Sequence, residues 1–285
     1  MTLFVNDLTK LDVSLWCSQR GLIGASWRVD AEFIGELGED GVLFDSDHVA
    51  SWIQSRLNAS MNQTLLVPTR APQLSVQECA EGLCVRTTLP YAMEIKAPRQ
   101  AFTLLPWSGI SLERLAAHYS EALSRLPPPR VLGIRLSLHE ELIDEAAYTF
   151  SHGLKLHTGN DQRIAHGHRS RLHIWCNGER QPELEARWAQ RLNDRYLVDT
   201  ADILEDSAKS GGKQSSDRLT LGYRAEQGRF LLRLPRERCE ILPVSTSIEH
   251  IAAWLADQIA RDCGQTVRVQ AFEGIGKGAI AEASA

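Results

Sequence analysis

The sequence predicts an α+β protein built from two related units, and three observations support this expectation. First, PRQAFTLLPWS at residues 98–108 recurs as PRERCEILPVS at residues 235–245, with five identities in eleven positions at a constant offset of 137. Second, several segments alternate polar and apolar residues, which is typical of half-buried strands. Third, two segments space their apolar residues by three and four positions, which indicates amphipathic helices.

The repeat extends beyond this motif and divides the chain. After a one-residue slip, residues 111–117 align with residues 247–253, and every apolar position is kept. Near the start of each half, LIGAS aligns with AHGHR, so one glycine is shared whereas two histidines are not. Because 285 residues suffice for two domains of about 140 residues, we expect domains at residues 1–141 and 142–285.

Each half is expected to run strand, strand, helical segment, strand, helix, strand, with the strands in antiparallel sheet. Residues 28–34 and 171–176 have period-two alternation and follow the shared glycine. Residues 111–126 and 247–261 have helical spacing, and each begins with a serine that can cap a helix. The junction is expected at residues 141–145, where an acidic stretch replaces the apolar pattern.

Composition excludes several classes of function. The net charge is −5, from 31 basic and 36 acidic residues, and no long basic run is present to follow a phosphate backbone, so nucleic acid is not an expected partner. No apolar run approaches the ~20 residues of a membrane span, and the N-terminus does not resemble a signal peptide. The six cysteines lack CxxC spacing. These features favour a cytoplasmic protein with reduced thiols and no membrane partner.

Histidines cluster in the second half, where five of the nine lie between His152 and His173. His166 and His168 flank a glycine at the expected start of a strand, so both side chains point to one face and can share an ion. His152 ends another strand-like segment, and three imidazoles would leave tetrahedral zinc one open position. An HxH pair alone also occurs without metal. His157 and His173 are expected at the surface or behind the ligands, with His173 as a reserve ligand.

The histidine motifs resemble those of the 6-pyruvoyl-tetrahydropterin synthase and 6-carboxytetrahydropterin synthase family. Phe150-Ser151-His152 is similar to the Phe-Ser-Ala-x-His segment of that family, and His166-Gly167-His168 is similar to its His-Gly-His. Together they resemble its three zinc ligands. Three later segments are also similar to the family and extend the resemblance over about residues 146–282: YLVD at 196–199, STSIE at 245–249 and FEG at 272–274.

The resemblance implies that each half is a tunnelling-fold unit, a four-stranded antiparallel sheet with two helices on one face. Residues 1–141 would be a degenerate unit without metal ligands, and residues 142–285 would hold the zinc and pterin site. Such units close into barrels only by oligomerising. A homo-oligomer with sites at the interfaces between units is therefore implied.

Two positions depart from the family pattern. The family has a proton-abstracting cysteine four residues before His-Gly-His, where this chain has Gln162, and an amide cannot take up a proton near neutral pH. The Asp-His pair of the family is represented by Asp217 and Arg218. Asp217 is the first remaining candidate for proton transfer and His157 the second, while Arg218 could hold a phosphate or an oxyanion. Gln162 marks either a lost activity or one in which the amide orients a water.

Glu273 corresponds to the glutamate with which the family anchors the pterin ring. A carboxylate can accept two parallel hydrogen bonds from the guanidine-like N–H pair of a pterin or guanine. The alternative is a residue at the rim of the site that forms only a salt bridge. Thr246 and Ser247, at the expected helix start, are the other candidates for substrate binding.

Three hypotheses follow. In the first, the chain is a zinc-dependent lyase acting on the side chain of a reduced pterin, such as a dihydroneopterin derivative, where zinc acidifies a proton beside a bound oxygen. In the second, it is a catalytically silent zinc-containing protein that binds a pterin or purine. In the third, the first half has a structural role and supplies barrel strands and interface residues, which is compatible with either of the others.

Overall fold

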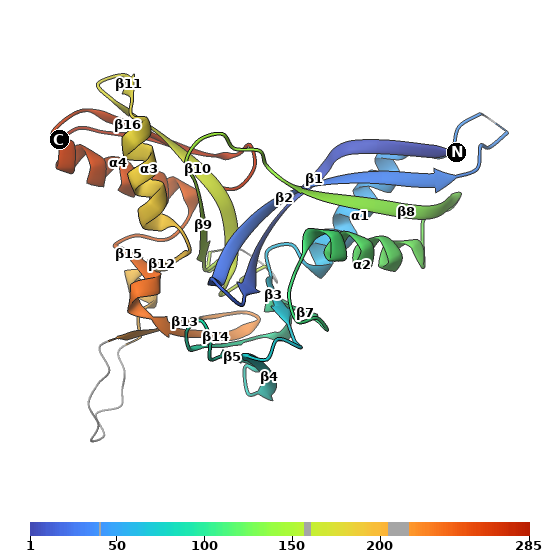
Figure 1. Ribbon diagram of the computed structural model, residues 1–285, viewed down its shortest axis with the longest axis horizontal. Helices are drawn as coiled ribbons and strands as arrows, with labels where there is room; N and C mark the ends of the chain where they lie inside the picture. Colours follow the sequence, from blue (N-terminus) through green and yellow to red (C-terminus); the bar gives the residue numbers. More distant parts are fainter. Residues whose placement is uncertain (40, 157–160, 205–216) are drawn as a thin grey trace.

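The described chain combines three β-sheets with four α-helices (Figure 1), which confirms the expected α+β class. This computed structural model describes residues 1–285 except residue 40, residues 157–160 and residues 205–216. In those described parts, no helix is both long enough and apolar enough to cross a membrane.

The first sheet is formed by the N-terminal half in the order β7–β3–β1–β2–β8. The long strands β1 and β2 form an antiparallel hairpin, and β8 pairs antiparallel with β2. In contrast, β3 runs parallel to β1, and β7 runs parallel to β3. The strands are β1 (Thr2–Cys17), β2 (Gly21–Gly35), β3 (Leu65–Pro68), β7 (Phe102–Leu105) and β8 (Val131–Glu140).

Two helices pack on this sheet over an apolar core that belongs to the first half alone (Figure 1). Helix α1 (Ser46–Ser60) begins after Asp45, whose carboxylate accepts hydrogen bonds from two backbone N–H groups of the first turn. Helix α2 (Leu112–Ser124) begins after Ser111, whose hydroxyl accepts from the backbone N–H of Arg114. The predicted serine cap of α2 is therefore confirmed.

The second sheet is formed by the C-terminal half in the order β15–β12–β9–β10–β16–β17, with β11 paired to β10. Helices α3 (Pro182–Leu192) and α4 (Ile248–Cys263) pack against it. Ser247 occupies the cap position of α4, but its hydroxyl contacts the ring Nδ1 of His250 instead of the backbone. The strands are β9 (Ala147–His152), β10 (His166–Cys176), β11 (Glu179–Arg180), β12 (Arg195–Asp199), β15 (Cys239–Leu242), β16 (Val267–Phe272) and β17 (Gly278–Ala283).

The two sheets repeat one topology, because β7–β3–β1–β2–β8 corresponds in order to β15–β12–β9–β10–β16. They differ from the expected four-stranded antiparallel unit, since each is wider and includes parallel pairs. The cause is the connection: α1 and α3 carry the chain back across the sheet, so β3 and β12 pair parallel to β1 and β9. The short strands β7 and β15 then pair parallel with β3 and β12 and form the edges of the two sheets.

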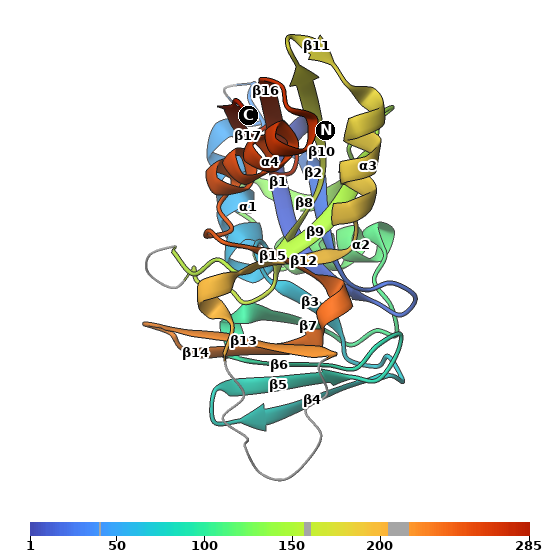
Figure 2. The same cartoon turned by 90° about the vertical axis from the view of Figure 1, so that its left-hand side faces the viewer.

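A third sheet, in the order β13–β14–β6–β5–β4, joins the two halves (Figure 2). Strand β14 of the second half pairs antiparallel with β6 of the first half. The apolar core beneath this sheet takes side chains from both halves, so the halves share a core as well as having one each. The strands are β4 (Leu74–Cys79), β5 (Gly82–Thr87), β6 (Met93–Ala97), β13 (Arg218–Ala225) and β14 (Gly228–Pro235), and the short helices are η1 (Arg99–Ala101), η2 (Thr200–Asp202) and η3 (Arg236–Arg238).

The β1–β2 hairpin crosses the β9–β10 hairpin closely, as Figures 1 and 2 show. A Cβ atom added to Gly167 would lie 2.6 Å from the Cα atom of Gly24, so the crossing requires glycine at this point. Beside it, the hydroxyls of Ser14 and Ser151 are 2.8 Å apart. The crossing brings the N-terminal hairpin against the strands that carry the clustered histidines.

Candidate metal centre

Three buried histidines of the strands β9 and β10 lie close together. His152 and His166 are direct partners across the two strands, and His168 lies two residues further along β10, on the same face as His166. Their exposed fractions are 1%, 3% and 0%, respectively. One ring nitrogen of each lies within 4.8 Å of the others. The structure therefore brings together the three predicted ligands.

The spacing of one pair of these nitrogens matches a tetrahedral zinc site. The Nε2 atoms of His152 and His168 are 3.3 Å apart. In a tetrahedral site with Zn–N distances of about 2.0–2.1 Å, two ligand nitrogens are separated by about 3.3–3.4 Å. Three neutral imidazoles also form a donor set that zinc accepts while one coordination position stays open for a water or substrate. The residues thus fit the metal that the sequence predicts.

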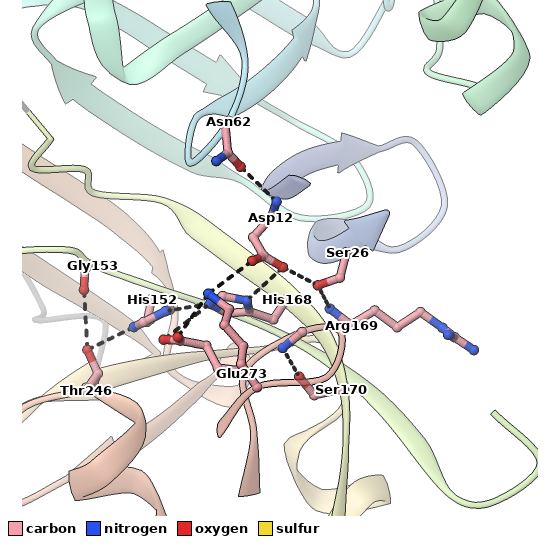
Figure 3. Close-up of polar contacts among 12 residues, drawn as sticks. Asp12, Ser26, Asn62, His152, Gly153, His168, Arg169, Ser170, Thr246 and Glu273 are labelled. Atoms are coloured by element: carbon pink, nitrogen blue, oxygen red, sulfur yellow. Dashed lines mark hydrogen bonds and ion pairs between the residues drawn. The ribbon is translucent and has the colours of Figure 1, made fainter. Parts of the chain in front are cut away.

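The hydroxyl of Thr246, just before α4, fixes the ring of His152 (Figure 3). The Nδ1 atom of His152 is 3.3 Å from Thr246 Oγ1, and that hydroxyl donates to the carbonyl of Gly153 at 3.4 Å. In this network Nδ1 of His152 can donate to the hydroxyl, because the hydroxyl directs its own proton to the carbonyl of Gly153. The Nε2 atom then faces the other histidines, 3.3 Å from His168 Nε2.

The ring of His168 lies against Asp12, which belongs to β1 of the first half (Figure 3). Asp12 Oδ1 is 3.2 Å from His168 Nδ1, and it accepts a hydrogen bond of 2.5 Å from the hydroxyl of Ser26. Burial raises the pKa of Asp12, but the neighbouring His168 and Lys277 outweigh this effect, so the pKa lies below its ordinary value. Asp12 is therefore an ionised, acceptor-only group.

Glu273 directly follows β16 and lies beside the histidine cluster. Its Oε1 atom is 3.8 Å from His168 Nε2, and its Oε2 atom is 3.3 Å from the Nζ atom of Lys277. Lys277 is also 3.4 Å from Asp12 Oδ2. Burial lowers the pKa of Lys277, but the two carboxylates raise it above its ordinary value, so the ammonium stays charged. Glu273 thus forms a salt bridge, as the alternative interpretation of this residue expects, and it also lies beside the three histidines.

A cavity of about 190 Å³ opens beside His152 and contains Thr246, Ser247 and Glu273 in its lining. The structure therefore brings all three predicted substrate-binding residues to one place. The cavity also contains Lys155, whose Nζ atom lies 2.9 Å from Asp199 Oδ2 and 2.6 Å from Asp202 Oδ1.

The candidates for proton transfer are not brought to this cavity within one chain. Gln162 is buried on the segment before β10, and its backbone carbonyl accepts a hydrogen bond from Arg163. Asp217 and Arg218 are exposed where β13 begins, and Arg218 lines a different cavity on the third sheet. His157 lies outside the described residues.

His173, the reserve ligand, is not part of the three-histidine group. Its Nε2 atom lies 2.6 Å from Glu145 Oε1 on the segment that joins the halves.

Sequence reasoning missed Asp12, Ser26 and Lys277 as neighbours of the site. The first two lie far from the histidines in the sequence and in no recognisable motif. The only available signal was the glycine shared by the two halves, which marks the strand crossing.

The chain is similar to known proteins of one family. The sequence model of the family described as 6-pyruvoyl tetrahydropterin synthase matches residues 141–284, which is half of the chain. The solved 6-pyruvoyltetrahydropterin synthase of Plasmodium vivax is 15% identical with a TM-score of 0.37, and that of Plasmodium falciparum is 13% identical with the same score. Each alignment covers 44% of this chain and 78% of the other. No curated protein matches the sequence. The family match shows that this chain belongs to the 6-pyruvoyl tetrahydropterin synthase family.

Proposed function

We propose that this chain is a zinc-dependent lyase that acts on the side chain of a reduced pterin. The observation that carries the proposal is the set of three buried imidazoles, with Nε2 atoms of His152 and His168 3.3 Å apart, beside a cavity that contains Glu273. When bound by these histidines, zinc would polarise a side-chain oxygen of the pterin and make the neighbouring proton more acidic.

The cavity residues have separate tasks in this proposal. The Glu273 carboxylate accepts two parallel hydrogen bonds from the N–H pair of the pterin ring and so sets the orientation of the ring. Lys277 Nζ lies 3.3 Å from the second oxygen of Glu273 and so limits the movement of the carboxylate. Thr246 contacts Nδ1 of His152, and Ser247 lines the cavity just before the α4 helix begins.

Proton transfer is the step that this chain must perform differently from the family pattern. Gln162 cannot accept a proton, so the amide can at most orient a water. We propose that Asp217 accepts the proton, with Arg218 beside it, in the site of a neighbouring copy of the chain. Both are exposed where β13 begins, as this arrangement requires. Native mass spectrometry should therefore show a homo-oligomer.

A second candidate is a catalytically silent protein that retains zinc and binds a pterin or purine. The presence of Gln162 at the position of the family base favours it. Both candidates need the histidines and Glu273, and they differ only in turnover.

The deciding experiment measures zinc content and the anaerobic conversion of dihydroneopterin triphosphate by mass spectrometry in the same sample. We expect one zinc per chain and product formation, both lost in His166→Ala. Glu273→Gln should keep zinc but weaken pterin binding about 10- to 100-fold, because a hydrogen bond to a charged group contributes about 1.5–3 kcal/mol. Zinc and bound pterin without product would select the silent protein, and the absence of zinc would overturn both candidates.

A further inference from the structure

We infer that Asp12 of the first half positions the metal ligand His168, so that the half without metal ligands completes the metal site of the other half. The inference rests on the proposed zinc site. It concerns a residue outside the segment that matches the family, and it assigns a task to the N-terminal half.

The two nitrogens of His168 face different partners. Nε2 is directed to the ligand cluster, 3.3 Å from His152 Nε2, and Nδ1 is 3.2 Å from Asp12 Oδ1. A carboxylate this close to Nδ1 favours the tautomer that carries its proton there, which leaves the Nε2 lone pair for the metal, and its negative charge increases the basicity of the ligand. His168 is fully buried, and the side chain of Asp12 is 10% exposed, so solvent competes little for this contact.

Asp12 is itself held in place by several hydrogen bonds. Its backbone N–H donates to Asn62 Oδ1 at 2.9 Å, and its backbone carbonyl accepts from the N–H of Gln63 at 2.8 Å. The hydroxyl of Ser26, on the partner strand β2, donates to Oδ1. Ser26 in turn accepts from the backbone N–H of Arg169, next to His168 on β10. The carboxylate is therefore tied both to its own half and to the ligand strand.

The turn after β16 closes over the same carboxylate. A Cβ atom on Gly274 would lie 2.3 Å from Asp12 Oδ1, and Gly274 has a φ of +73°, so only glycine allows this approach. Lys277, on the other side of the turn, reaches both Asp12 and Glu273. Asp12 thus contacts the metal ligand and the segment that carries the proposed ring anchor.

The rings of His152 and His168 each contact a group behind the ligand cluster, and these two groups differ in charge. His152 uses the neutral hydroxyl of Thr246 from its own half, whereas His168 uses an ionised carboxylate from the other half. A carboxylate partner strengthens imidazole as a ligand more than a hydroxyl does. Removal of the Asp12 charge should therefore weaken metal binding in a folded protein.

The test measures the affinity of the full-length apo-protein for Zn²⁺ by competition with a chromophoric chelator. We expect Asp12→Asn to bind zinc about 10- to 100-fold more weakly than the wild type. The matched control is Asp194→Asn, which makes the same change in a carboxylate that also pairs across the halves, with Arg20, but lies away from the histidines. Its zinc affinity should equal that of the wild type. The visible spectrum of bound Co²⁺ should change in Asp12→Asn and not in the control.

The outcomes separate this inference from the proposed function. Zinc binding by the wild type with equal affinity in Asp12→Asn would overturn the role of Asp12 and leave the zinc site standing. No zinc binding by the wild type would overturn both. If Asp12→Asn does not fold, Ser26→Ala takes its place, because it removes one hydrogen bond from the carboxylate and keeps the charge. It should lower the zinc affinity several-fold, and an unchanged affinity would count against the inference.

Discussion

At the scale of single residues, the hydroxyl of Thr246 decides which nitrogen of His152 faces the metal site. We predict that Thr246→Val lowers zinc affinity about tenfold, since the buried Nδ1–H then has no acceptor at that point and the ring loses its fixed orientation. Chelator competition on the apo-protein measures the effect. Thr246→Ser keeps the oxygen and should bind zinc like the wild type. A valine variant with wild-type affinity would show that the ring is held by packing alone.

The sequence predicts the clustering of the three histidines well and the groups behind them poorly. His166 and His168 share a face because strand side chains alternate, and that rule needs no tertiary information. Asp12 could not be found in this way. Its contact with His168 exists because two hairpins cross, and the position of that crossing depends on the packing of the whole molecule.

At the scale of secondary structure, the crossing of β2 over β10 is the contact that gives the site its shape. A Cβ atom on Gly167 would meet Gly24 Cα at 2.6 Å, Phe150 O at 2.7 Å and Ser14 Oγ at 2.8 Å. Two of these atoms are backbone, so they can move only if the strands move. Because Gly167 lies between His166 and His168, a shift of the strands also displaces these two proposed metal ligands.

We therefore predict that Gly167→Ala lowers the free energy of unfolding by about 1–3 kcal/mol and weakens zinc binding. Gly133→Ala in β8 is the matched control, because its Cβ atom would make an ordinary contact of 3.5 Å with Ile34. Urea denaturation measures both variants. Equal stability of the two variants would mean that the hairpins can separate at little cost.

The helices could be predicted more accurately than the sheets. The segment expected at residues 111–126 forms α2 at Leu112–Ser124, and that expected at 247–261 forms α4 at Ile248–Cys263. Helical periodicity is a local property, whereas a strand chooses its partner over long distances. The parallel pairs β1–β3 and β9–β12, and the pairing of β14 with β6, have no local sequence signal.

At the scale of the whole molecule, the two halves have the same strand order, which is what a tandem duplication predicts. The duplication itself and the boundary at residues 141 and 142 stay predictions. The halves are nevertheless not separate in the structure. Phe230 and Leu232 of β14 share an apolar core with Val85 and Ile95 of the first half, and all four are almost completely buried.

This shared core predicts that the chain unfolds as one unit. Separation of the halves would expose the third sheet's core and break the contact between Asp12 and His168, so neither half keeps its native surroundings alone. We expect thermal unfolding of the full chain to give one transition, with coincident curves from tryptophan fluorescence and far-UV circular dichroism. Zinc at about 100 times its dissociation constant should add about 2.7 kcal/mol to the free energy of unfolding and move the whole transition upward. Two transitions, of which zinc raises only one, would show instead that the halves fold independently and that the N-terminal half contributes nothing to the metal site.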